Sequence, residues 1–195
     1  MSKVTLNTAK ELELMDTAAA KIKAVLPHLS PEEIREKYGK KFEKYVSGGT
    51  EMPYEIEVAL WHPGEGEGVH NELELQSYTS NDVGFLARGT VGELWVIEDK
   101  ANNYAKYSLL DGTPLTKEAL TDDFITVARN ETFTYLVQAT ESIVVCDGWG
   151  KEYYCPAGAY IACGVNKETG EPDLGYFWVI AEKVVDTTNK KCVVK

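Results

Sequence analysis

The chain has 195 residues, of which 44% are hydrophobic and 26% are charged, proportions that exclude a disordered or low-complexity chain. No apolar run approaches the ~18 residues of a membrane span, and residues 1–7 lack the apolar core of a signal peptide. The sequence therefore predicts a cytoplasmic protein that does not use a membrane as a partner.

The net charge of −11 is concentrated in one stretch of the chain. Residues 51–99 carry eleven acidic side chains and a single basic one, Arg88. Such a field repels nucleic acid and attracts basic surfaces. We expect no direct nucleic-acid binding, and the charge favours a protein partner with a basic surface.

Residues 1–50 are predicted to form a helical hairpin. Apolar residues recur at three- and four-residue steps over residues 8–26, which is typical of one helical stripe. Ser30 as N-cap and Pro31 at the first helical position predict the start of a second helix. The glycines at residues 48–49 are expected to end this second helix.

The remainder of the chain is predicted to be rich in short strands, because β-branched and aromatic residues dominate and turn signals recur. Alternation in residues 72–75 indicates a strand with one wet, acidic face. The predicted strands are residues 54–60, 72–78, 84–88, 94–97, 106–109, 124–128, 133–138, 142–146, 153–154, 160–163 and 176–180.

One sequence pattern occurs twice. An aromatic, two apolar residues, a variable residue and a glycine occupy residues 85–89 and again residues 160–164. Each copy precedes a Trp-Val-Ile strand, with the tryptophans at Trp95 and Trp178, and each strand is followed by a segment spaced for one or two helical turns. The repetition predicts an internal duplication, with β-rich units at residues 51–110 and 111–195.

The repeated segments resemble the PGDYG family of uncharacterised bacterial and phage proteins. Residues 156–161 look like the family's signature and residues 92–97 look like the strand that follows it. Gly84 and Ala159 stand where the family has an aspartate, so a role for that aspartate is not implied. The resemblance implies a phage or mobile-element setting and is compatible with two tandem copies.

The predicted fold class is α+β, with the N-terminal helical hairpin packed on two tandem pseudo-symmetric β-rich units in one domain. Motifs for a serine nucleophile, a phosphate-binding loop or a dinucleotide are absent from the sequence. We therefore expect a protein that is not an enzyme and that needs no cofactor. The four cysteines lack metal-site spacing and are expected to be reduced, mostly buried thiols.

A glycine-rich loop at residues 61–74 holds two histidines and four carboxylates. His62 and His70 are weak candidates for metal ligands, because alternating glycines do not preorganise a coordination shell. The loop is more typical of a solvated acidic hairpin, and a partner-binding loop is the remaining interpretation.

Two functional hypotheses follow. The first is a non-catalytic binding protein, such as a phage-encoded inhibitor, whose acidic face docks on the nucleic-acid-binding surface of a host or defence protein. Its partner-binding residues would be Glu55, Glu57, Glu65, Glu67, Glu72 and Glu74.

The alternative is a small-ligand or nucleotide-sequestering protein with an aromatic pocket at the junction of the repeats. Its ligand-binding residues would be Trp95, Tyr104, Trp149, Tyr160 and Trp178. A virion or assembly accessory protein is a further alternative.

Overall fold

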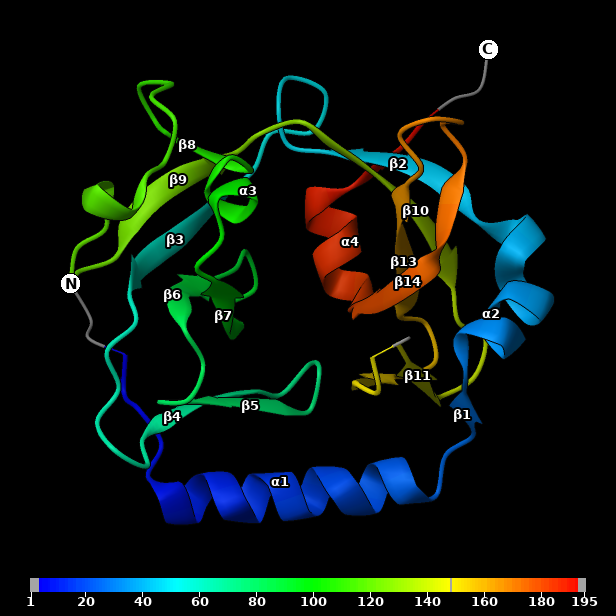
Figure 1. Cartoon of the computed structure of the whole chain (residues 1–195), viewed down its shortest axis with the longest axis horizontal. Coiled ribbons are helices and arrows are strands. Elements are labelled where there is room, and N and C mark those ends of the chain that lie inside the picture. Colours follow the sequence, from blue (N-terminus) through cyan, green and yellow to red (C-terminus); the bar gives the residue numbers. More distant parts are fainter. Residues whose placement is uncertain (1–3, 148, 193–195) are drawn as a thin grey trace.

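The computed structural model describes residues 4–147 and 149–192, and it has an α+β fold in which sheets predominate. Two five-stranded sheets lie on opposite sides of the molecule, and the longest helix runs along one edge beneath both (Figure 1). The described helices are α1 (Ala9–Ala24), α2 (Pro31–Tyr38), α3 (Ala101–Tyr104) and α4 (Glu182–Thr188), with single 3₁₀ turns at Gly39–Lys41 and Lys117–Ala119.

The starts of α1 and α2 are set by capping boxes. The side chains of Thr8 and Ser30 accept hydrogen bonds from the backbone N–H of the third helical residue, Glu11 in α1 and Glu33 in α2. The carboxylates of these two glutamates in turn accept hydrogen bonds from the backbone N–H groups of the two cap residues. Each box satisfies backbone N–H groups that a helix leaves without a partner at its first turn. Both helices begin where the sequence predicts.

The predicted second helix is too long, and the two helices do not form a simple hairpin. The helix ends at Tyr38, and after one 3₁₀ turn the chain forms strand β2 (Glu43–Ser47). The aromatic and β-branched residues of this stretch, Tyr45 and Val46, pair between two strands of a sheet instead of covering one. α1 contacts β4 and β5, whereas α2 contacts β14, β1 and β11.

The first five-stranded sheet has the strand order β7-β6-β3-β9-β8, and the second has the order β14-β13-β10-β2-β15. All neighbouring strands in both sheets are antiparallel. The first sheet contains β3 (Glu55–Leu60), β6 (Gly84–Arg88), β7 (Leu94–Glu98), β8 (Tyr107–Leu109) and β9 (Ile125–Arg129). The second contains, besides β2, β10 (Thr132–Gln138), β13 (Tyr160–Val165), β14 (Pro172–Ile180) and β15 (Lys190–Lys191).

The second five-stranded sheet takes one strand from the far side of the chain. β2 precedes every strand of the first sheet but lies in the second, between β10 and β15. The first sheet is built from one continuous stretch, residues 55–129, in which β9 lies between β3 and β8. In Figure 1 the cyan β2 accordingly lies among strands of the last third of the chain, and the yellow-green β9 lies beside β3.

The two sheets also share their strand register. Trp95 of β7 is opposite Ala87 of β6, and Trp178 of β14 is opposite Ala162 of β13. These four residues occupy matching places in the repeated sequence pattern, so both copies are paired in the same way. The short helices α3 and α4 follow β7 and β14 as the sequence predicts.

A hairpin lies beside each of the two sheets. β4 (Gly68–Asn71) and β5 (Gln76–Thr79) form one, and β11 (Ile143–Cys146) and β12 (Glu152–Cys155) form the other, which β1 (His28–Leu29) extends to three strands. The prediction of a strand over residues 72–78 is wrong at its start. Glu72 to Leu75 form the turn between β4 and β5, and the backbone reverses with Leu75 at a φ of 50°.

Separate hydrophobic clusters stabilise the two halves. The cluster of the first sheet is centred on Val58, Phe85 and Val127, which are fully buried beside α3. The cluster of the second sheet packs Phe177 and Ile161 against α2. Along the edge of the molecule, α1 buries Leu12 and Ala19 but leaves Val25 and Ile22 exposed.

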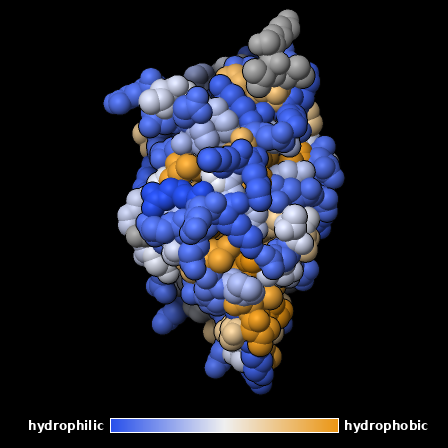
Figure 2. All heavy atoms as spheres, turned by 90° about the vertical axis from the view of Figure 1, so that its right-hand side faces the viewer, coloured by the Kyte–Doolittle hydropathy of each residue, from blue (hydrophilic) through white to orange (hydrophobic). Residues whose placement is uncertain are grey.

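Most of the face seen from the side of α2 is hydrophilic, and apolar side chains gather toward its lower end (Figure 2). That end is the level at which α1 lies in Figure 1. Within the described residues, no helix is both long and apolar enough to cross a membrane.

The chain that leaves β2 passes close to the connection between β9 and β10. Gly48 follows β2 with a φ of 73°, and a Cβ at this position would lie 2.5 Å from the carbonyl oxygens of Arg129 and Asn130. Gly49 donates a hydrogen bond from its N–H to the carbonyl of Arg129 at 2.9 Å. These glycines therefore mark the crossing of the two connections and not the end of a helix.

We expect Gly48→Ala to lower the free energy of unfolding by about 2 kcal/mol or more, because it combines a strained φ with a backbone clash. Gly112→Ala is the matched control, since its φ is 88° and nothing lies within 4 Å of an added Cβ. The control should lose only about 1 kcal/mol. Urea denaturation measures both, and equal losses would contradict a tight crossing at Gly48.

Candidate ligand-binding pocket

A cavity of about 250 Å³ lies between the two five-stranded sheets. Strands of both sheets, the turn between β4 and β5, the turn between β6 and β7, and helix α4 all contribute to its wall. Its lining combines two indoles and two phenols with charged and amide side chains. The lining residues used below are Trp95, Trp178, Tyr54, Tyr107, Arg129, Glu74 and Glu93.

Residues at matching positions of the two sheets line this cavity. The shared strand register relates the first sheet to the second position by position. The matching pairs in the lining are Trp95 and Trp178, Ile56 and Thr134, Arg129 and Ser47, and Tyr107 and Asn189. The tryptophans are kept in both copies, whereas each of the other pairs differs in polarity or charge.

Arg129 is the only basic side chain among the described residues that line the cavity. Its guanidinium lies over the ring of Tyr107, 4.9 Å from the ring centroid, where the electron-rich face attracts the cation. Its Nε is buried and has no hydrogen-bond partner among the described residues. A buried N–H without a partner costs free energy, about 1–3 kcal/mol.

Two carboxyl groups line the same cavity, and burial raises the pKa of both Glu74 and Glu93. Tyr78 donates a hydrogen bond from its hydroxyl to Glu74 Oε2 at 3.4 Å. The N–H of Val91 donates to Glu93 Oε2 at 3.1 Å. Each carboxyl thus has a fixed position and a tendency toward its neutral form, which can donate as well as accept a hydrogen bond.

The phenols of the cavity stay neutral. Burial raises the pKa of Tyr54 to about 12, although the nearby charge of Arg129 opposes the shift. Burial also raises the pKa of Tyr107, again against the charge of Arg129. Both side chains therefore present apolar ring area to the cavity without adding negative charge at neutral pH.

The five predicted ligand-binding aromatics are only partly brought together. Trp95 and Trp178 both line the cavity. Trp149 is 79% exposed and packs on Tyr176, whose ring in turn packs on Trp178 with centroids 5.9 Å apart. An aromatic row therefore leads from the surface to the cavity wall.

The other two aromatics of that set have structural surroundings. Tyr104 packs on Phe85 in the core of the first sheet and donates its hydroxyl hydrogen bond to Asp99 at 3.0 Å. Tyr160 packs edge-on against Tyr45 with ring centroids 6.3 Å apart. Neither residue lines the cavity between the sheets.

The six predicted acidic docking residues lie on three separate segments. Glu55 and Glu57 belong to β3, and Glu57 forms an ion pair with Arg88 at 2.6 Å. Glu67 accepts a hydrogen bond from the N–H of Gly64. Glu74 faces the cavity. Glu55, Glu65, Glu67 and Glu72 are exposed.

The two weak candidates for metal ligands are not combined into a site. His62 is exposed, whereas the Nδ1 of His70 lies 2.9 Å from Ser77 Oγ and 4.0 Å from Asp16. Burial lowers the pKa of His70, which favours a neutral imidazole bonded to its neighbours. In the part of the chain that the structure describes, neither histidine belongs to a cluster of three metal-ligand side chains.

The cysteines are free thiols, as predicted from their spacing. Cys155 and Cys163 are fully buried, and burial raises the pKa of each thiol to about 12. A thiol with so high a pKa is a poor nucleophile at neutral pH. Cys146 and Cys192 are only partly buried.

Sequence reasoning found the tryptophans of the cavity through the repeated pattern, but it missed Arg129, Glu93 and the role of Glu74. Arg129 ends an ordinary strand, and it reaches the cavity through the long-range pairing of β9 with β3. No local motif signals that placement.

Comparison with known proteins does not extend this description, since no family model, curated protein or solved structure matches the chain. The resemblance to the PGDYG family therefore stays a prediction.

The raised pKa of Glu74 makes a stability prediction with a definite sign. In the folded protein the pKa of Glu74 lies above its ordinary value of 4.5, so the neutral carboxyl stabilises the fold at acidic pH. This contribution is lost as the pH rises through the folded pKa. We expect Glu74→Gln to raise the melting temperature at pH 8 by on the order of 3 °C. The gain should shrink toward pH 4.

Thermal unfolding across this pH range measures the effect. Glu72→Gln is the matched control, because Glu72 is exposed in the same turn and should give little change at any pH. A Glu74→Gln variant that is less stable than the wild type at pH 8 would show that the buried carboxylate is stabilising.

Proposed function

We propose that the protein is a non-catalytic binding protein that holds a small planar ligand with an anionic group in the cavity between its two sheets. The observation that carries this proposal is the buried Nε of Arg129, which has no partner among the described residues and lines a cavity that also contains two indoles.

The anionic group of the ligand follows from Arg129. A guanidinium binds carboxylate and phosphate oxygens through its forked N–H groups, and burial strengthens such charge-assisted hydrogen bonds. The packing of the Arg129 guanidinium on Tyr107 holds its plane in place. An anion would satisfy the Nε and offset the positive charge at once.

The planar part of the ligand follows from Trp95 and Trp178. Indole rings offer large, rigid surfaces on which a base or another flat ring can stack. The volume of about 250 Å³ lies just below the range of ~300–1,000 Å³ for pockets of drug-sized ligands. The ligand is therefore a single ring system with one anionic group, and Glu74 and Glu93 can bond to its polar edge.

We further propose that the cavity arose by internal duplication. The repeated sequence pattern, the matching order of three strands (β7-β6-β3 and β14-β13-β10) and the matching register at the tryptophans support this origin. Duplication would place the two tryptophans at matching positions, and later divergence at Arg129 and Ser47 would make the cavity polar on one side.

The acidic docking hypothesis has less support than the cavity. Of its six glutamates, Glu57 is paired with Arg88, Glu67 bonds the backbone of its own loop, and Glu74 turns to the cavity. The four exposed glutamates, Glu55, Glu65, Glu67 and Glu72, are spread over three different segments.

The proposal predicts selective stabilisation by small aromatic anions. We expect one or more probes among the four nucleoside 5′-monophosphates, benzoate and indole-3-acetate to raise the melting temperature of the wild type and to change its tryptophan fluorescence. The uncharged counterparts, the nucleosides and benzamide, should bind about tenfold more weakly or worse.

Variants locate the binding site. Arg129→Gln should remove the preference for the anionic probe, and Trp178→Ala should weaken both probes of a pair by about tenfold, the loss of one stacking contact. Trp149→Ala is the control, because this exposed indole does not line the cavity. A panel in which no probe binds, or binding that Arg129→Gln leaves unchanged, would refute the proposal.

A further inference from the structure

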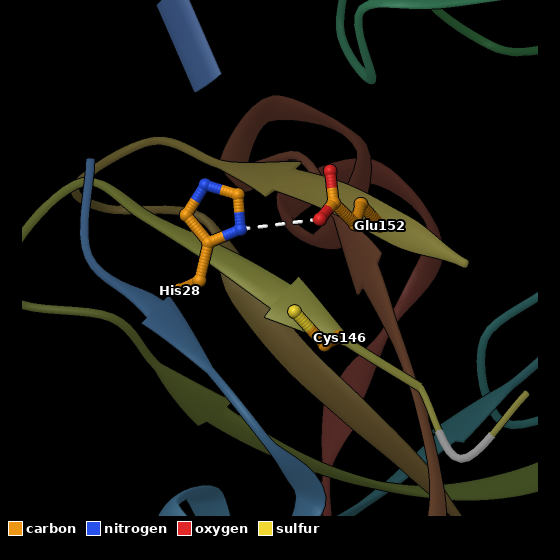
Figure 3. Close-up of side chains that lie close together, drawn as sticks. All are labelled: His28, Cys146 and Glu152. Atoms are coloured by element: carbon orange, nitrogen blue, oxygen red, sulfur yellow. Dashed lines mark hydrogen bonds and ion pairs between the residues drawn. The ribbon is translucent and has the colours of Figure 1, made fainter. Parts of the chain in front are cut away.

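A second group of functional side chains lies outside the cavity, on the three-stranded sheet beside α1. His28 of β1, Cys146 of β11 and Glu152 of β12 bring a ring nitrogen, a sulfur and a carboxylate oxygen within 4.8 Å of one another (Figure 3). Cys146 and Glu152 are direct partners in the strand register. His28 pairs with Val144, two residues before Cys146, and so lies on the same face.

The hydrogen bonds of His28 determine which ring nitrogen is available. Its Nε2 lies 3.0 Å from the carbonyl oxygen of Lys23. A carbonyl can only accept, so Nε2 carries the proton and donates it. A backbone carbonyl in this place is the usual outer partner of a histidine that binds a metal through its other nitrogen.

The remaining nitrogen, Nδ1, lies 3.2 Å from Glu152 Oε1. In this neutral tautomer Nδ1 carries a lone pair and no proton. Two hydrogen-bond acceptors, Nδ1 and the Glu152 carboxylate, therefore lie side by side, and a cation between them would make the contact favourable. A proton on Nδ1 is one such cation, and it would give an ordinary ion pair. A metal ion is the other, and only the metal also gives Cys146 a role.

The surroundings of Cys146 are negative. Burial, followed by the charges of Glu152, Glu33 and Asp147, raises the pKa of its thiol. A divalent cation would reverse this effect, since a coordinating thiol is deprotonated by the metal itself. The ammonium of Lys23 is the nearby competing charge, but it lies 3.5 Å from the backbone carbonyl of Glu152, to which it donates.

We propose that His28 Nδ1, Cys146 Sγ and the Glu152 carboxylate bind a zinc ion. A mixed nitrogen, sulfur and oxygen set suits zinc, whose bonds of ~2.0–2.3 Å place tetrahedral ligand atoms about 3.6 Å apart. The side chains need to close only slightly from their present separations of up to 4.8 Å. A fourth ligand can come from water, because an open pocket reaches His28 and Glu152.

Zinc at this position would join two segments that are distant in the sequence. His28 follows α1, whereas Cys146 and Glu152 form the hairpin beside the second sheet. The metal would therefore fix the end of α1 to that hairpin. It acts separately from the cavity between the sheets, since none of its three ligands lines that cavity.

The test uses the full chain, prepared free of metal and titrated with zinc in competition with a chromophoric chelator. We expect one equivalent of zinc to bind to the wild type and to raise its melting temperature. Cobalt(II) should give a thiolate-to-cobalt charge-transfer band. Wild-type protein that binds no zinc, or cobalt binding without that band, would overturn the proposal.

Variants assign the ligands. Cys146→Ser and His28→Gln should each weaken zinc binding by about 10- to 100-fold, and Cys146→Ser should abolish the charge-transfer band. Cys192→Ser is the control, because it is the other partly buried thiol and lies outside the cluster. Zinc affinity that Cys146→Ser leaves unchanged would overturn the site.

Folding is checked by comparing metal-free melting temperatures. If Cys146→Ser or His28→Gln does not fold, Glu152→Gln provides the second test, since this side chain is 46% exposed. It should keep the fold and weaken zinc binding, and an unchanged zinc affinity in this variant would count against Glu152 as a ligand and against the proposal.

Discussion

The insertion of β2 into the second sheet is the constraint on which the rest of the structure depends. This strand precedes every strand of the first sheet, and without it the central strand β10 lacks one neighbour and β15 lacks the strand with which it pairs. The connections cross where the backbone at Gly48 approaches the carbonyls of Arg129 and Asn130. Only a glycine with positive φ fits that approach.

The inserted strand also contributes to the cavity and to its asymmetry. It brings Ser47, the last residue of β2, to the place in the second sheet that matches Arg129, the last residue of β9, in the first. The two tryptophans give the cavity matching apolar walls, whereas the charge lies on one side only. This difference is why we propose a ligand that has one flat part and one anionic part.

Much of the fold could be predicted from the sequence, because local signals were strong. The capping boxes at Thr8 and Ser30 and the repeated Trp-Val-Ile strands are local in sequence, and they lie where the patterns indicate. The destination of β2 could not be predicted, since its apolar spacing also suits a helix and its partners lie 85 or more residues away. The roles of Arg129 and of the His28 cluster depend on the same long-range pairings.

Hydrogen exchange of the backbone amides tests the central claim, the insertion of β2 into the second sheet, most directly. We predict that the amides of β2 are protected as strongly as those of β10, because β2 pairs with both β10 and β15 inside that sheet. Amides of β2 that exchange through a separate, lower-energy opening, while those of β10 stay protected, would contradict the insertion.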